Sequence, residues 1–143
     1  MSTPIITPEL ASALRLSLLR AARRLRSQRV NTAVTLSQLS ALATVCKSGP
    51  MTAGEIASIE RVQPPSMTKI LASLEAAGWI GRAAHPEDRR QSIISITQSG
   101  RDLLAEETRA RDEWLAERLV DFSDEELKIL RDAVDVLNRL GSE

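Results

Sequence analysis

The sequence predicts a mainly α-helical fold with a small β-hairpin, and two observations support this. Through most of the 143 residues, apolar side chains recur every three or four positions, which is the spacing of helices with a buried face. That spacing changes only between residues 79 and 97, where Ile94 and Ile96 alternate with Ser95 as in a half-buried strand. Hydrophobic residues make up 43% of the chain and aromatic residues only 2%, so the core must be mostly aliphatic.

The first helix is expected to begin near Glu9, and more than one of its faces is apolar. Its leucines and alanine are Leu10, Leu14, Leu18, Ala21 and Leu25 on one line, with Leu16 and Leu19 off that line. Six arginines follow in and just after it: Arg15, Arg20, Arg23, Arg24, Arg26 and Arg29. Two interpretations of these arginines stay open, a solvated face and pairing with an acidic segment.

A second helix is expected from a cap at Thr35 to about Lys47, because Gly49 and Pro50 end it. Cys46 falls on the apolar stripe of this helix. We interpret it as a small buried hydrophobic residue, and a redox-active thiol is the alternative.

A short third helix is predicted from Thr52, which with Glu55 fits a capping box. Ile56 and Ile59 are expected to point inward. The helix must end near Val62, because the next residue precedes a proline and is disfavoured in helical conformation.

The fourth helix is predicted to begin at Pro65, where no backbone N–H is needed, and to end at a Gly78 cap. Its buried stripe is expected to be Met67, Ile70, Leu71 and Leu74. Two short helices with a tight turn between them are typical of a helix-turn-helix. Strands at 79–84 and 92–97, joined by a loop at 85–91, would add a hairpin wing.

The C-terminal part is predicted to be two helices. The first follows Gly100 and is polar nearly all round at 105–113, as in a helix that crosses solvent. A second capping box at Ser123–Glu126 starts the last helix, which has two apolar lines and therefore suits an interface with another subunit. Leu127, Leu130, Val134 and Leu137 form one line, and Ile129, Ala133, Val136 and Leu140 form the other.

Composition argues against several classes of function. With one Cys and one His, an internal disulfide is excluded and the usual ligands of a zinc site are lacking, so we expect no metal and no cofactor. No catalytic constellation or phosphate loop is present, so the chain is predicted not to be an enzyme. We found neither a signal peptide nor a credible membrane span, which predicts a cytoplasmic protein. Net charge is zero, but residues 1–50 hold seven basic and one acidic residue, whereas 101–143 hold seven and thirteen.

Two surfaces are candidates for DNA binding. The first is the fourth predicted helix, called here the recognition helix. Its small and polar residues allow close approach to a major groove, and Lys69 can reach guanine or phosphate. The predicted contacts there are Gln63, Pro64, Pro65, Ser66, Thr68, Lys69 and Ser73. In the wing they are His85, Asp88, Arg89 and Arg90. Arginine suits a narrow minor groove, and Asp88 is expected to orient the Arg90 guanidinium through charge-assisted bonds.

Two motifs resemble those of MarR-type transcriptional regulators. Asp88-Arg89-Arg90, followed by Ile96-Thr97-Gln98-Ser99-Gly100, resembles the D-x-R wing motif and the apolar-T-x-x-G that follows it, and residues 62–78 resemble the recognition helix. The resemblance implies a winged helix-turn-helix homodimer with intertwined N- and C-terminal helices, a pseudo-palindromic double-stranded DNA operator, and regulation, often repression, by small molecules or oxidants.

On this resemblance, residues 1–34 form an N-terminal dimerisation helix and 35–100 the winged helix-turn-helix lobe. Residues 101–143 form a linking helix and a C-terminal dimerisation helix, within a single intertwined domain overall. The predicted function is a transcriptional repressor released by a small-molecule ligand, whose pocket no motif locates. Arg20, Arg24, Arg29 and Trp114 are the candidates for its lining, and packing or surface roles are the alternative for each. A redox-responsive regulator through Cys46 and a winged helix used for protein contacts are the alternatives.

Overall fold

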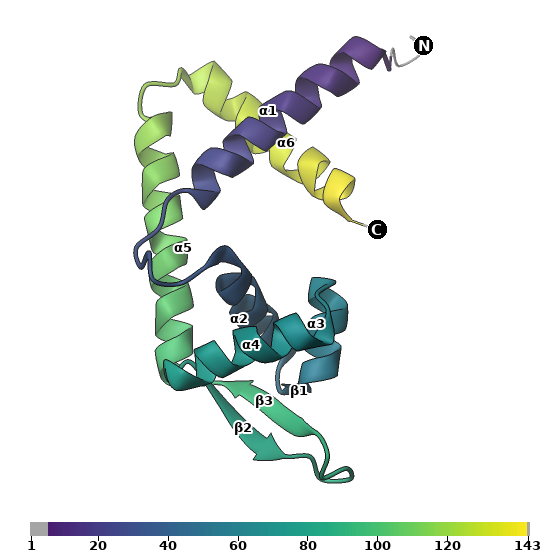
Figure 1. The fold of residues 1–143 in the computed structure, drawn as a ribbon. Helices are drawn as coiled ribbons and strands as arrows, with labels where there is room; N and C mark the ends of the chain where they lie inside the picture. The colour runs from purple at the N-terminus through teal and green to yellow at the C-terminus, as the bar shows by residue number, and fades with distance from the viewer. Residues whose placement is uncertain (1–5, 143) are drawn as a thin grey trace. The chain divides into compact units, whose positions relative to one another are not determined.

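The computed structural model describes residues 6–142, and the chain divides into two compact units. Residues 29–109 form one unit, called here the lobe. The residues up to 28 and those from 110 onward form the other, called the terminal unit. Within the described range there are six α-helices and three short strands (Figure 1), which confirms the mainly helical class with a small sheet. The chain therefore passes between the units twice, after Gln28 and after Arg109.

Two helices of the lobe begin at the predicted caps. In front of α2 (Leu36–Ser48), the Thr35 hydroxyl accepts the Gln38 N–H at 3.1 Å. The Gln38 side chain accepts the Thr35 N–H in return at 2.8 Å, which completes a capping box. In front of α3 (Ala53–Glu60), the Thr52 hydroxyl accepts the Glu55 N–H at 3.2 Å, which is the first half of the predicted box.

The inward face of α3 differs from the prediction at one position. Ile56 is fully buried as expected, but Ile59 is 55% exposed, so its predicted inward position is wrong. Glu60 turns toward α2 instead, where its carboxylate accepts hydrogen bonds from the Ser40 and Thr44 hydroxyls. The two hydrogen bonds of Glu60 therefore take the place on the inward side of α3 where Ile59 was predicted.

The helix-turn-helix continues into α4 (Pro64–Ala76) after Arg61 adopts a left-handed conformation with φ of 54°. The helix begins one residue before the predicted Pro65, with Gln63 as the capping residue. Gly78 follows it with φ of 80°, a conformation that glycine adopts without steric cost. The helices enclose an aliphatic core together with the sheet. Its fully buried large side chains include Val34, Leu42, Val45, Ile56, Met67, Leu71, Leu74 and Ile94.

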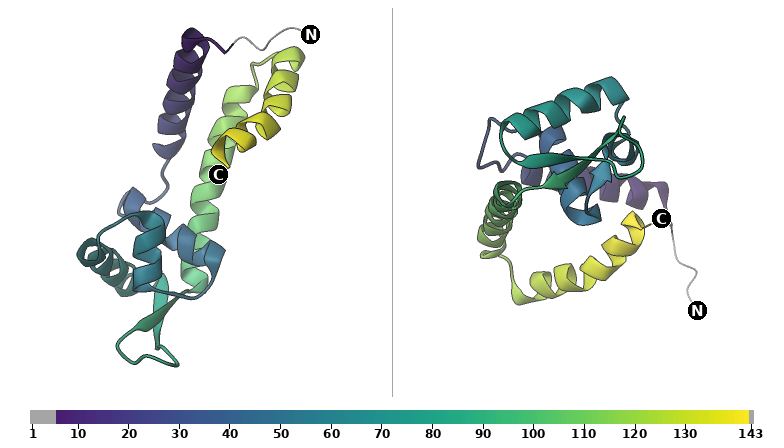
Figure 2. Two further views of the ribbon diagram at one scale, coloured as in Figure 1. Left: turned by 90° about the vertical axis from the view of Figure 1, so that its right-hand side faces the viewer. Right: turned by 90° about the horizontal axis from the view of Figure 1, so that it is seen from below.

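The sheet has three antiparallel strands in the order β1-β3-β2, one more than the predicted hairpin. The hairpin consists of β2 (Ile80–Ala84) and β3 (Ser92–Ile96), and it projects from the helices of the lobe (Figure 1; Figure 2, left). The additional strand β1 (Met51–Thr52) pairs Met51 with Ile94. Two residues are too few to show a periodicity, so the sequence contains no signal for this strand.

A threonine and a glycine fasten the start of α5 (Gln98–Leu119) to the end of α4. The Thr97 hydroxyl donates to the Gly78 carbonyl at 2.7 Å and accepts the Gly100 N–H at 3.1 Å. A Cβ atom on Gly100 would lie 2.3 Å from the Trp79 carbonyl oxygen, so only glycine fits at this contact. The helix starts at Gln98, three residues before the predicted position after Gly100.

The polar middle of α5 contains a buried carboxylate, which corrects the prediction of a helix solvated on all sides. Glu107 is 1% exposed. One of its oxygens accepts the N–H groups of Val30 and Asn31 at 3.3 and 3.0 Å. The other lies 3.9 Å from Arg29 Nε. Glu107 therefore ties the first part of α5 to the connector that leads into α2, a contact within the lobe.

The terminal unit contains α1 (Pro8–Arg26), α6 (Asp124–Gly141) and the last part of α5. Thr7 caps α1, which begins at Pro8, one residue before the predicted start. Ser123 with Glu126 forms the predicted capping box of α6. Along their described lengths, neither α1 nor α6 has a buried residue. Within residues 6–142, no helix combines the length and apolar character that a membrane span requires.

Candidate nucleic-acid interface

One face of α4 is exposed and the opposite face forms part of the core. Met67, Leu71 and Leu74 are buried. The exposed residues are the predicted contacts at the start of the helix, Gln63, Pro64, Pro65, Ser66, Thr68 and Lys69. Because prolines occupy the first two helical positions, the helix starts with fewer N–H groups to satisfy, and the Gln63 side chain makes no capping bond. Its amide is therefore available to a partner.

Ser73 lies in a different environment from the other predicted contacts of α4. It is half-buried, and its hydroxyl accepts a hydrogen bond from the Gln38 side chain at 2.7 Å. The same hydroxyl donates to the Ile70 carbonyl at 2.6 Å. Ser73 therefore joins α2 to α4 within the lobe.

The wing loop carries two exposed arginines on a hydrogen-bonded turn. Arg89 and Arg90 are exposed and Asp88 is half-buried. One Asp88 carboxylate oxygen accepts the backbone N–H of Arg90 at 3.0 Å, and the Asp88 carbonyl accepts the Gln91 N–H at 3.1 Å. The carboxylate thus binds the backbone of Arg90 and not, as the sequence predicted, its guanidinium. Asp88 shapes the loop and leaves the arginine side chain to solvent.

His85 stands at the opposite end of the same loop. Its ring is half-buried, and its Nδ1 atom accepts the N–H groups of both Glu87 and Asp88 at 3.0 Å. The backbone N–H of His85 also donates to the Gln91 carbonyl at 3.2 Å, which closes the loop. The side chain predicted as a DNA contact is therefore part of the internal structure of the wing tip.

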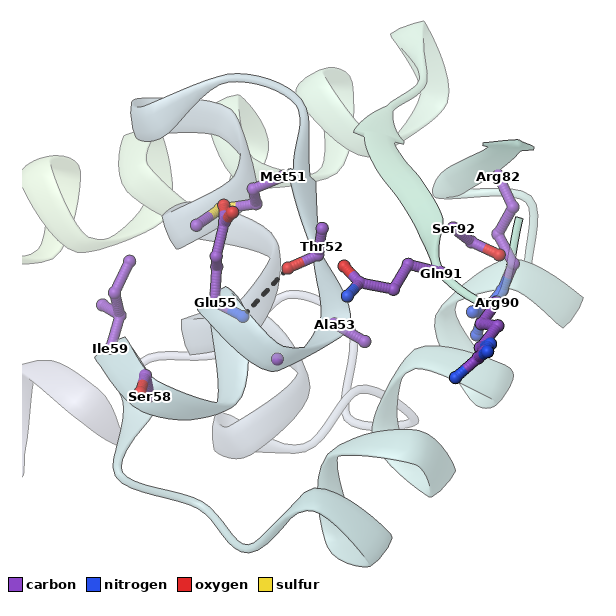
Figure 3. A pocket seen from close by; sticks show the side chains of 11 residues that line it. Met51, Thr52, Ala53, Glu55, Ser58, Ile59, Arg82, Arg90, Gln91 and Ser92 are labelled. Carbon is purple, nitrogen blue, oxygen red and sulfur yellow. Dashed lines mark hydrogen bonds between the residues drawn. The ribbon is translucent and has the colours of Figure 1, made fainter. Parts of the chain in front are cut away.

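A cleft of about 830 Å³ separates the hairpin from the first turn of α3 (Figure 3). In the close-up, Arg82 and Arg90 lie along one side, and Glu55, Ser58 and Ile59 along the other. Arg82 was not predicted as a site residue. Its Nε atom donates to a Glu75 carboxylate oxygen on α4, so it ties β2 to the recognition helix. The only signal in the sequence was an arginine within the predicted first strand of the wing.

Comparisons with known proteins agree with this geometry. Residues 34–92 match the model of the MarR family. An HTH-type transcriptional regulator of Mycobacterium tuberculosis is 48% identical over 134 residues, which cover 94% of each chain. The chain belongs to the MarR family. It is therefore a DNA-binding helix-turn-helix transcriptional regulator and not an enzyme.

Solved structures show that this MarR-family regulator has the family's winged fold along nearly its whole length. A transcriptional regulator of Pseudomonas aeruginosa superposes with a TM-score of 0.84 at 30% identity, covering 94% of this chain and 95% of that one. A MepR variant from S. aureus bound to an oligodeoxyribonucleotide superposes with a TM-score of 0.71 at 21% identity, covering 92% and 97%.

The remaining candidates of this MarR-family regulator belong to other segments than α4 and the wing loop. Cys46 is half-buried on α2, with Arg101 Nη1 3.7 Å from its sulfur. Arg29 belongs to the contact with Glu107 described above. Trp114 lies under the guanidinium of Arg118, 5.2 Å from the ring centroid. Within the lobe, these contacts give Cys46 and Arg29 packing partners and do not bring either to the wing.

Proposed function

We propose that this regulator binds a pseudo-palindromic operator as a homodimer, with α4 in the major groove and the wing over the adjacent minor groove. It then acts as a repressor that a small molecule releases. The observation that supports this most is that two DNA-binding surfaces belong to the same compact unit. The exposed face of α4 carries amide, hydroxyl and ammonium groups, and the loop of the hairpin presents Arg89 and Arg90.

The chemistry of α4 suits a major groove. The amide of Gln63 can pair with adenine, and Lys69 can donate to guanine or to phosphate. Pro64 and Pro65 offer apolar contact to a thymine methyl group. The Thr68 hydroxyl donates to the Pro64 carbonyl at 3.0 Å and keeps its lone pairs as acceptors for a base amino group. We leave Ser73 out of the proposed contacts, because Gln38 and Ile70 occupy its hydroxyl.

The terminal helices support the homodimer. Burying leucine-sized side chains contributes about 1.5–3 kcal/mol each, yet α1 and α6 leave most of theirs in solvent in the single chain. On α6, Ile129 is 66% exposed and Leu140 is 62% exposed, and on α1 Leu10 is 56% exposed. A second copy of the chain would cover these faces through a two-fold interface. Two lobes would then present two α4 helices to half-sites about 34–36 Å apart.

Release by a ligand requires two states of the dimer that differ in DNA affinity. The chain crosses between lobe and terminal unit only at two points along the sequence, so we propose that ligand binding alters the spacing of the two lobes. Repression and effector release are what the family resemblance implies. An operator on a bacterial chromosome would place the regulator in the cytoplasm.

Redox release through Cys46 is a second candidate, because a guanidinium lies 3.7 Å from its sulfur. A basic neighbour favours thiolate reactivity. Peroxide separates the two: under the small-molecule mechanism it leaves operator binding of the parent unchanged, whereas under the redox mechanism it weakens operator binding of the parent and not of the Cys46→Ser variant.

The proposed contacts are tested by titrating operator fragments from the regulator's own locus at fixed salt. We expect Arg90→Ala to lose affinity by roughly 10- to 100-fold while unfolding like the parent, since a groove-inserted arginine contributes about 1–3 kcal/mol. Lys128→Ala on α6 is the matched control for loss of one exposed positive charge, and it should bind normally. Operator affinity that is equal for Arg90→Ala and the parent would contradict the wing's role. Affinity that does not fall as salt rises would indicate a protein-binding winged helix instead.

A further inference from the structure

The wing tip is a short loop closed by hydrogen bonds at both ends. The His85 N–H donates to the Gln91 carbonyl and the Gln91 N–H donates to the Asp88 carbonyl. Within this frame, the Asp88 carboxylate holds the N–H of Arg90. The exposed arginines therefore project from a backbone whose geometry depends on two side chains, Asp88 and His85.

The His85 ring has a role that only one of its protonation states permits. Its Nδ1 atom accepts two backbone N–H groups, from Glu87 and Asp88, each at 3.0 Å. A ring nitrogen that accepts hydrogen bonds carries no proton, so the ring must be neutral with its proton on Nε2. Protonation would set an Nδ1–H group against two N–H donors and abolish both bonds.

We propose that His85 is a positioning residue of the wing, whose neutral imidazole holds the backbone that presents Arg89 and Arg90, and that protonating it loosens the wing and weakens operator binding. This rests on the proposed role of the wing arginines in DNA binding. Protonation at Nδ1 would remove the acceptor of both N–H groups, so acidification would loosen the wing.

His85 is the only histidine of the chain, so a ring titration can be assigned to it without ambiguity. The charged groups of its own loop are Glu87, Asp88, Arg89 and Arg90. The neighbouring strand β2 contributes Arg82, which pairs with Glu75 of α4, and strands β1 and β3 contain no titratable residue. The two N–H donors of Glu87 and Asp88 are the groups that contact Nδ1 directly.

The first test observes the full-length protein without DNA. In isotope-labelled protein, the imidazole nitrogen shifts should show the proton on Nε2 at about pH 7.5. The amide proton shifts of Glu87 and Asp88 should then move upfield with the same midpoint as the ring when the pH falls to about 5.5. A proton on Nδ1, or amide shifts that do not follow the ring, would overturn the proposal independently of any DNA measurement.

The second test compares two variants in operator titrations. His85→Asn keeps a neutral acceptor near the position of Nδ1, whereas His85→Ala removes it. We expect His85→Ala to bind roughly tenfold more weakly at about pH 7.5, as loss of two hydrogen bonds implies, and His85→Asn to bind like the parent. As the pH is lowered, the parent should lose operator affinity relative to His85→Asn, whose amide is not protonated; equal pH dependence of the two would overturn the protonation step.

The outcomes separate the possibilities. Equal weakening in His85→Asn and His85→Ala, with the amide shifts of Glu87 and Asp88 unchanged, would show that the ring itself contacts DNA and would overturn a positioning role. Normal DNA affinity in every variant, together with the expected shifts in the free protein, would overturn the proposed function of the wing while supporting the hydrogen bonds of His85.

Discussion

Two single residues of this regulator hold neighbouring segments together, and the structure constrains the residue type at each. Gly100 lies against the Trp79 carbonyl, and Glu107 is buried beneath the connector to α2. Both lie outside the proposed DNA-binding surface. Their replacement should therefore affect folding before it affects recognition.

Replacing Gly100 by alanine should destabilise the protein by about 2–3 kcal/mol, because the added Cβ would overlap the Trp79 carbonyl oxygen and the Ile96 side chain. Gly54→Ala is the matched control, since the nearest atom to its new Cβ lies 3.9 Å away and alanine favours the helix. Urea unfolding at one fixed protein concentration measures both. A Gly100→Ala variant as stable as Gly54→Ala would contradict the close contact.

Replacing Glu107 by alanine should cost about 2–4 kcal/mol of unfolding free energy, because Arg29 would lose its carboxylate and two backbone N–H groups would lose their acceptor. Glu106→Ala, an exposed neighbour, should change stability by less than about 0.5 kcal/mol. Thermal and urea unfolding of both variants check this. Equal stability of the two variants would show that the buried carboxylate contributes nothing.

At the scale of elements, α4 combines a stable buried face with a weakly capped start. Gln63 occupies the capping position without making a capping bond. Aspartate and serine are much better caps, worth about 0.5–2 kcal/mol relative to residues that do not cap. Gln63 therefore stabilises the start of α4 poorly. Its amide is at the position where it could contact a base.

Gln63→Asp should accordingly raise unfolding free energy by about 0.5–1 kcal/mol and lower operator affinity, because it places a negative charge near the DNA phosphates. Gln63→Ser should give a similar stability gain without the charge. Unfolding curves and operator titrations on the same preparations measure the two effects. If Gln63→Asp binds as tightly as the parent, the start of α4 lies away from the DNA.

For the whole molecule, the exposed apolar faces of α1 and α6 decide the expected assembly. The double variant Ile129→Glu and Leu140→Glu should sediment as a monomer and lose high-affinity operator binding, since charged residues at a buried apolar interface are costly. Leu36→Glu, at a residue 47% exposed in the lobe, should remain dimeric. A dimeric double variant would place the subunit interface elsewhere.

The sequence by itself determined the helices, their caps and the hairpin. These depend on local rules: hydroxyl caps at Thr35 and Ser123, a positive φ at Gly78, and alternation around Ser95. The motifs around Asp88 and Gly100 also indicated the family from residue types alone. The Asp88 contact with the Arg90 N–H is local, whereas the reason for Gly100, its contact with the Trp79 carbonyl, is visible only in the structure.

Only the tertiary structure decided which polar groups face inward. Strand β1 exists because β3 lies beside it, and Glu107 is buried because the connector at Val30 and Asn31 needs an acceptor. His85 and Asp88 both bind backbone N–H groups of the wing. The sequence had instead predicted that His85 contacts DNA and that Asp88 binds the Arg90 guanidinium. A hydrogen-bond partner depends on how the chain folds back on itself, and neither periodicity nor composition records that.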